Sequence, residues 1–299
     1  MKSRTHLRSL LLLLLTTLIW GSTFPLLKDM VTTLPPALLI GSRFLVAALA
    51  FLPCCALPNL PPLTLGLLRD GSRLGLVAFI SFLAQVVGLE TVSANRAAFI
   101  TGLNVVMVPL LGWLLGRGIS LKVFAAALLA FGGIAVMSGQ TGTLGSGDLW
   151  ILVCAFSYAV YILLTEAVTA RHSPIQLTAV QLITIALLGI AWTLWTLPLD
   201  NLATLVVQQL RPHWVALVYL GLIATALTTW MQVTAQRHLS ATEAAILYSL
   251  EPVFAALFSF WWLAERLSLR EGMGAMLVLV AMIWSQLGNS AAEPAKPAG

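Results

Sequence analysis

Apolar stretches long enough to cross a bilayer follow one another along the whole chain. They run for about 18 to 22 residues, and short segments rich in proline, glycine or charge separate them. An α-helix rises 1.5 Å per residue, so each stretch crosses the roughly 30 Å hydrocarbon core of a membrane. The pattern predicts ten transmembrane helices, at residues 8–27, 36–57, 73–90, 96–116, 121–139, 148–166, 175–196, 214–235, 241–262 and 271–288.

The gaps divide these helices into two groups of five. A run rich in glycine, threonine and serine over 139–147 follows the fifth stretch. We therefore predict an N-terminal five-helix repeat over 1–145 and a C-terminal one over 146–290. The last residues, 291–299, are small and polar with prolines among them, which predicts a disordered tail.

The two halves share an internal repeat. Residues 85–116 align with 232–263 at a constant offset of 147 positions. Because each half has five helices, the second copy enters the membrane from the opposite side, which predicts two inverted repeats around a central cavity near the midplane. The alternative is a chance alignment of helices rich in leucine, alanine and glycine. The identical pairs are Ser93 and Ser240, Ala94 and Ala241, Ala97 and Ala244, Ala98 and Ala245, and Leu103 and Leu250.

The composition agrees with a protein surrounded by lipid. Hydrophobic residues make up 59% and charged residues 9% of the chain, whereas soluble domains carry about 25% charged residues. The mean hydropathy is +0.95. The net charge of +5 comes from basic residues scattered between apolar runs, so nucleic acid is not an expected partner. Cys54, Cys55 and Cys154 lie in apolar runs without CxxC spacing, and neither a metal nor another cofactor is predicted.

The start of the chain has the form of a signal peptide, with Lys2, Arg4 and Arg8 before a leucine run. An A-x-A-like cleavage site is absent and the apolar stretch continues to Leu27, so we interpret it as an uncleaved first transmembrane helix. With the N-terminus inside, roughly twice as many lysines and arginines fall on the inner side as on the outer side. This predicts cytoplasmic N- and C-termini in a plasma membrane, the inner membrane of a bacterium.

Glu251 is the clearest candidate for chemistry at membrane depth. It lies about ten residues into a predicted helix and precedes Pro252. A charge at this depth needs a partner or a water-filled cavity. Glu251 therefore either binds a cationic group or a proton in the cavity, or caps backbone groups freed at a proline kink. Its counterpart in the first repeat, Asn104, is polar but uncharged.

Other polar and aromatic residues at similar depth are candidates for the same site. Gln85 and its counterpart Gln232 either line the cavity or bond to a neighbouring helix. Trp20 either contacts a ligand or anchors the first helix at the interface. Tyr158 and Tyr248 either stack on a ligand or serve packing. The predicted substrate-binding residues are Trp20, Thr23, Gln85, Asn104, Tyr158, Gln232, Tyr248 and Glu251.

The remaining charges are interpreted as structural or solvated. Arg43 lies seven residues into the second predicted helix, about 10 Å below the surface by helical rise. We favour snorkelling or a structural ion pair over substrate contact for Arg43. Charges near helix ends are interpreted as solvated loop residues: Glu90, Arg96, Glu166, Glu243, Glu265 and Arg266.

Four segments carry a resemblance to a known family. They are WGSTF at Trp20–Phe24, Arg43-Phe44, SANRAAFIT at Ser93–Thr101 and LEPVFAALFSFWWLAERLSL at Leu250–Leu269, of which the last is the most specific. In these segments the chain resembles the EamA-type family of the drug/metabolite transporter superfamily. The resemblance implies ten helices in two five-helix repeats, a central cavity lined by helices 1, 3, 4, 6, 8 and 9, and export of amino acids or other metabolites. Asn104 and Gly118 depart from the pattern of the second half, where Glu251 and Glu265 stand.

We predict a secondary transporter that exports small organic metabolites such as amino acids by alternating access at this cavity. The sequence lacks a GxxxxGK[ST] motif, which would indicate ATP use. The alternative is a flippase for lipids or lipid-linked molecules. An intramembrane enzyme is less favoured, because HExxH is absent and the histidines and aspartates lie in loops or at span ends. The expected partners are a small-molecule substrate and the lipid bilayer.

Overall fold

The computed structural model describes residues 2–53, 60–137, 144–198 and 202–289, and every regular element within these ranges is a helix. The predicted tail at 291–299 lies outside the described residues. The α-helices are α1 (Lys2–Met30), α2 (Pro36–Phe51), α3 (Leu65–Leu89), α4 (Ala94–Thr101), α5 (Asn104–Leu114), α6 (Leu121–Met137), α7 (Ser146–Thr169), α8 (Pro174–Thr196), α9 (Leu202–Leu210), α10 (Trp214–Val218), α11 (Thr228–Gln236), α12 (Ala241–Tyr248), α13 (Glu251–Leu263) and α14 (Leu269–Asn289).

Helical stretches of membrane-spanning length confirm a multi-pass, all-α membrane protein. Within the described ranges, seven stretches are long and apolar enough to cross a bilayer, and two shorter apolar helices, α2 and α6, accompany them. The seven are Arg4–Met30, Leu65–Leu89, Ala94–Leu114, Ser146–Thr169, Pro174–Thr196, Val206–Gln236 and Ala241–Leu263.

Two of the predicted continuous helices are interrupted. The predicted helix 96–116 breaks between α4 and α5 at Gly102 and Leu103, and the helix 241–262 breaks between α12 and α13 at Ser249 and Leu250. These breaks stand 147 positions apart, the offset of the internal repeat. Pro252 explains the second break, because its ring clashes with the carbonyl four residues earlier. The breaks also lie against one another, since a Cβ on Gly102 would stand 3.0 Å from Cγ of Pro252.

The structure corrects the prediction between the seventh and eighth spans. The sequence predicts a loop after residue 196, yet α9 covers Leu202–Leu210 and a 3-10 turn follows over Arg211–His213. The next predicted helix, 214–235, forms as α10 and α11 with a π-helical segment at Tyr219–Leu227 between them. A π segment inside an α-helix is rare and shifts the side chains that follow it around the helix axis.

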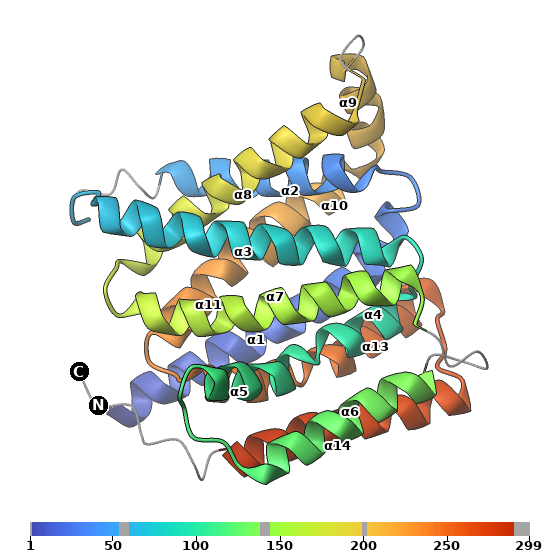
Figure 1. Ribbon diagram of the computed structural model, residues 1–299. Helices are drawn as coiled ribbons and strands as arrows, with labels where there is room; N and C mark the ends of the chain where they lie inside the picture. The colour runs from blue at the N-terminus through green and yellow to red at the C-terminus, as the bar shows by residue number, and fades with distance from the viewer. Residues whose placement is uncertain (1, 54–59, 138–143, 199–201, 290–299) are drawn as a thin grey trace.

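The helices pack as a bundle in which α6 and α14 lie side by side along one edge (Figure 1). The backbones of these two helices touch, because a Cβ on Gly133 would stand 2.8 Å from the carbonyl oxygen of Gly274. α1 crosses the middle of the bundle beside α13 (Figure 1). There a Cβ on Gly21 would stand 2.5 Å from Cβ of Phe254, so glycine permits the close approach. This contact sets Trp20 of α1 near the start of α13.

Candidate functional site

A cavity lies between α1, α2, α3, α4, α7 and α13, and the empty space in and around its mouth amounts to about 400 Å³. Both halves of the chain therefore contribute to its wall. The wall combines one guanidinium, one carboxylate, an amide, hydroxyls, a thiol and aromatic rings. The lining residues are Trp20, Thr23, Arg43, Ser81, Phe82, Gln85, Thr101, Cys154, Tyr158 and Glu251.

Five of the eight predicted site residues line this cavity: Trp20, Thr23, Gln85, Tyr158 and Glu251. The other three are not among its lining residues but lie close behind it. The phenol of Tyr158 donates a 3.2 Å hydrogen bond to Oε1 of Gln232. Tyr248 packs on Trp20, and Asn104 donates a 2.8 Å hydrogen bond to the carbonyl of Thr101.

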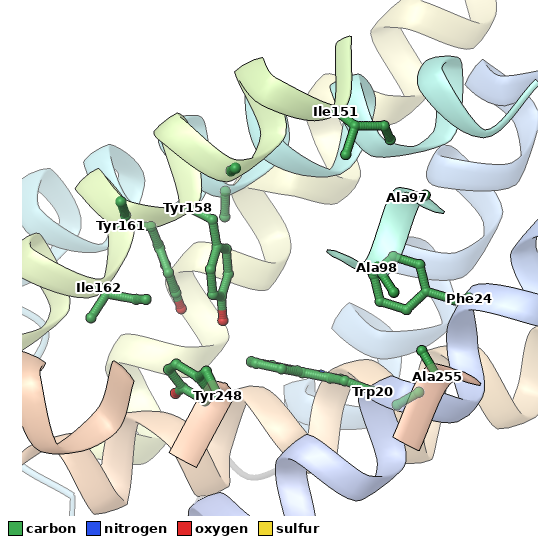
Figure 2. Close-up of a cluster of buried hydrophobic side chains, with 14 of the residues drawn as sticks. Trp20, Phe24, Ala97, Ala98, Ile151, Tyr158, Tyr161, Ile162, Tyr248 and Ala255 are labelled. Atoms are coloured by element: carbon green, nitrogen blue, oxygen red, sulfur yellow. The ribbon is translucent and has the colours of Figure 1, made fainter. Parts of the chain in front are cut away.

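Four aromatic rings pack together at the site, and two of them, Trp20 and Tyr158, line the cavity (Figure 2). The ring centroid of Trp20 stands 5.7 Å from that of Tyr158 and 5.5 Å from that of Tyr248, and Tyr158 stands 5.4 Å from Tyr161. Hydrogen bonds hold the rings in place: the Trp20 indole donates to Oγ1 of Thr228 at 3.0 Å. The predicted tyrosines thus come from α7 and α12 to meet the tryptophan of α1. Such a wall offers a stacking surface for an apolar or cationic group.

Glu251 is the first residue of α13, and the interruption before Pro252 turns it toward the cavity. Its side chain is buried, and no described residue forms a hydrogen bond or ion pair with its carboxylate. The start of a helix carries partial positive charge, which favours a carboxylate there. The predicted role as a cap for freed backbone groups has no hydrogen bond to support it.

Arg43 lines the cavity and its side chain stays buried, against the interpretation of a snorkelling side chain. It is 1% exposed, and its Nε donates a 2.7 Å hydrogen bond to Oγ1 of Thr225. Nη2 lies 3.4 Å from the carbonyl oxygen of Ala224. Both partners belong to the π-helical segment, so the irregular backbone of that segment positions the arginine. No carboxylate of the described residues lies within 4.0 Å of it, so the alternative of an ion pair is not seen either.

Sequence reasoning missed four other lining residues, Ser81, Phe82, Thr101 and Cys154. Ser81 stands one helical turn before Gln85, and this spacing could have identified it. Thr101 directly precedes the break between α4 and α5, which the sequence did not predict. Cys154 stood out in the sequence only as a cysteine in an apolar run, and it is buried at the cavity wall.

Several charges predicted to be solvated are instead paired between helices at the two ends of the bundle. We name these ends after Leu89, the last residue of α3, and Leu114, the last residue of α5. At the Leu89 end, Arg96 donates to both carboxylate oxygens of Asp148, at 2.7 and 2.6 Å.

At the Leu114 end, Arg117 donates a 2.7 Å hydrogen bond to Glu166, whose other oxygen accepts from the Ala241 amide at 3.1 Å. Glu265 likewise accepts a hydrogen bond from the Asn95 amide at the Leu89 end, at 3.3 Å. The interpretation of Arg96, Glu166 and Glu265 as solvated loop charges was therefore wrong, because each has a partner on another helix.

A multi-pass helical bundle with a partly polar cavity between its helices is an architecture that membrane transport proteins use. The model of the EamA-like transporter family matches the chain twice, over residues 7–139 and 145–286. The chain therefore belongs to the EamA-like transporter family, as the resemblance in its sequence indicated.

Individual relatives agree with this assignment. The chain is 32% identical over 272 residues to an uncharacterized transporter of Archaeoglobus fulgidus, covering 91% of this chain and 83% of the relative. It is 26% identical to the uncharacterized transporter YvbV of Bacillus subtilis, over 94% of this chain and 92% of the relative. A solved crystal structure matches with a TM-score of 0.67 and 17% identity, covering 97% of this chain and 99% of the other. At that identity the match shows the shared fold alone.

Proposed function

We propose that the protein is a secondary transporter that exports small organic metabolites such as amino acids by alternating access. The observation that carries the proposal is the cavity between the two halves, whose lining includes a buried arginine, a buried glutamate and aromatic rings. Opposite charges in one cavity suit a solute that itself carries both charges, as an amino acid does. Membership of a transporter family supports movement of the solute across the membrane.

The architecture that we propose is ten transmembrane helices in two inverted repeats, 1–145 and 146–290. Two observations support it. The family model matches twice, once within each half. The helix interruptions before Asn104 and Glu251 stand at equivalent positions of the internal repeat. In such an arrangement the halves rock against one another around a central site.

Contacts between the halves at the two ends would then open in turn. At the Leu114 end the contact is Arg117 with Glu166. At the Leu89 end it is Arg96 with Asp148, together with Glu265 on the Asn95 amide. Charge-assisted hydrogen bonds of this kind are strong when shielded from water, yet they re-form readily when the helices return. We propose that the Leu114 end faces the cytoplasm of a plasma membrane, with both termini on that side, following the distribution of basic residues.

Efflux from proteoliposomes tests the transport proposal. Purified protein is reconstituted with an internal mixture of amino acids, and release is followed by mass spectrometry against empty liposomes. The wild-type protein is expected to release a subset of the mixture, and Glu251→Gln to release far less of it. Glu271→Gln is the matched control, because Glu271 lies outside the cavity and caps the Ser268 amide at the start of α14. Equal release from protein-containing and empty liposomes would contradict amino-acid transport.

Fusion tags test the proposed topology. A tag at either terminus is expected to stay inaccessible to protease in intact cells and to become accessible once the membrane is permeabilised. Digestion of either tag in intact cells would overturn the orientation.

A further inference from the structure

One nitrogen of the Arg43 guanidinium, Nη1, has no hydrogen-bond partner in the described part of the chain. The side chain is 1% exposed, and Nε and Nη2 contact Thr225 and Ala224 of the π-helical segment. Nη1 forms no hydrogen bond with any described residue. An unpaired donor in the interior is unfavourable, and a ligand that accepts a hydrogen bond from Nη1 would remove that cost.

The charge of Arg43 is also uncompensated by the described residues. Arg96, by comparison, is paired with Asp148. Arg43 has no carboxylate within 4.0 Å, although Glu251 lines the same cavity. A buried cation without a counter-ion is costly at membrane depth and indicates a functional role. An anionic group that enters the cavity would supply the missing counter-ion.

Two phenylalanines hold the guanidinium in a fixed place. The Cζ atom of Arg43 stands 5.4 Å from the ring centroid of Phe44 and 5.1 Å from that of Phe82. The two rings themselves stand 4.9 Å apart, and Phe82 lines the cavity. Cation–π contacts offset part of the cost of burial but leave the in-plane donors of the guanidinium available. The arginine is thus oriented before any ligand arrives, which reduces the entropy lost on binding.

We propose that Arg43 is the anion-binding residue of the cavity and that the transported solute carries a small oxyanion, a carboxylate or a phosphate, that binds Nη1. The proposal rests on the proposed transport function and deepens it by naming the group that the solute must carry. It assigns Arg43 a role in selecting the solute, which the sequence pattern did not predict. Glu251, without a partner in the same cavity, is left to contact the opposite part of the solute.

An unbiased efflux experiment tests this proposal. Proteoliposomes are loaded with the soluble small molecules of a bacterial extract, and the compounds released by the wild-type protein are identified by mass spectrometry. The compounds released are expected to carry a carboxylate or a phosphate, and their chemistry decides between these two groups. Arg43→Gln is expected to slow their release at least about 10-fold, and Arg43→Lys is expected to lie in between, because lysine keeps the charge but loses the planar pair of donors. Arg73→Gln is the matched control, since the Arg73 side chain is 65% exposed and lies outside the cavity.

A competition experiment on the wild-type protein tests the proposal even if the Arg43 variants do not fold. Thermal unfolding of the detergent-solubilised variants shows whether they fold. The best solute found for the wild-type protein is compared with an analogue whose anionic group is neutralised, an amide or methyl ester for a carboxylate. The analogue is expected to compete at least about 10-fold more weakly. Release of compounds without an anionic group, or equal competition by the neutral analogue, or unchanged release by a folded Arg43→Gln variant, would overturn the proposal. Release of nothing beyond that from empty liposomes would instead refute the transport function itself.

Discussion

Arg117 and Glu166 come from different halves of the chain and meet at one end of the bundle, where Nη2 of the arginine stands 2.7 Å from Oε2 of the glutamate. The glutamate also accepts a hydrogen bond from the backbone amide of Ala241, the first residue of α12. One carboxylate therefore connects the loop after α5, helix α7 and the start of α12. The cavity lies between the two ends of the bundle, because Tyr158, which lines it, stands between Asp148 and Glu166 along α7.

Removing the charge of Glu166 is expected to open the Leu114 end. Glu166→Gln weakens the bond to Arg117 because a neutral amide accepts less strongly than a carboxylate. Cys154 at the cavity wall is a natural reporter, and Cys54→Ala with Cys55→Ala removes the other two thiols of the chain. We expect a membrane-impermeant maleimide, added from the Leu114 side of oriented vesicles, to label Cys154 several-fold faster in the variant.

The control for this experiment is Glu271→Gln, which makes the same chemical change at the exposed start of α14. Labelling from the Leu89 side should stay as slow as in the wild-type protein. Faster labelling from both sides would indicate general loosening of the bundle, and unchanged labelling from the Leu114 side would show that the ion pair does not close that end.

Asp148→Asn is expected to destabilise the Leu89 end and the protein as a whole. The Asp148 carboxylate accepts two hydrogen bonds from Arg96 and a third, of 2.8 Å, from the backbone amide of Gly145. Both side chains are largely buried, so the variant leaves a poorly compensated charge, at a cost of roughly 2–3 kcal/mol. Thermal unfolding in detergent should show a clearly lower midpoint.

The exchanged pair, Arg96→Asp with Asp148→Arg, is the control for the loss of the ion pair. It should recover part of the stability, since it restores opposite charges at the same two positions. A midpoint as low as that of Asp148→Asn would indicate that the cap on Gly145, and not the pairing with Arg96, is what Asp148 contributes.

These pairs also show why the sequence predicted the fold better than the site. Apolar runs reveal spanning helices because every residue of the run contributes to the signal. The partners of Arg96 and Glu166 lie 52 and 49 positions away, and nothing local to either residue indicates them. Glu251 was found because a single carboxylate beside proline in an apolar run stands out by itself.

For Arg43 the sequence indicated the depth of the residue in the membrane but not its contacts. The position of Arg43 along its helix could be read from the sequence. The orientation of its guanidinium depends on the π-helical segment that binds Nε and Nη2. That segment has no composition that distinguishes it from an ordinary apolar helix. The break between α4 and α5 was missed for a related reason, because no proline stands at the position equivalent to Pro252.

Glu251→Gln is expected to reduce transport without reducing stability. No described residue pairs with the carboxylate, so the amide removes a ligand contact and leaves the packing of α13 unchanged. Loss of one charge-assisted hydrogen bond, about 1.5–3 kcal/mol, corresponds to a drop of roughly 10-fold or more in the transport rate at low solute concentration. Initial efflux rates and thermal unfolding should be measured on the same preparations. Equal losses in both would assign Glu251 a structural role.

The contact between α6 and α14 is expected to depend on the absence of a side chain at Gly133. A Cβ there would stand 2.8 Å from the Gly274 carbonyl oxygen and 2.8 Å from Cγ2 of Val278, so the helices must separate to accommodate it. Gly133→Ala should therefore lower the unfolding midpoint, with a cost of about 1–3 kcal/mol from overpacking. The neighbouring Gly132 offers a matched control, because a Cβ there meets no atom within 4 Å. Gly132→Ala should be neutral or slightly stabilising, since alanine favours the helix. Equal midpoints for the two variants would show that α6 and α14 can move apart at little cost.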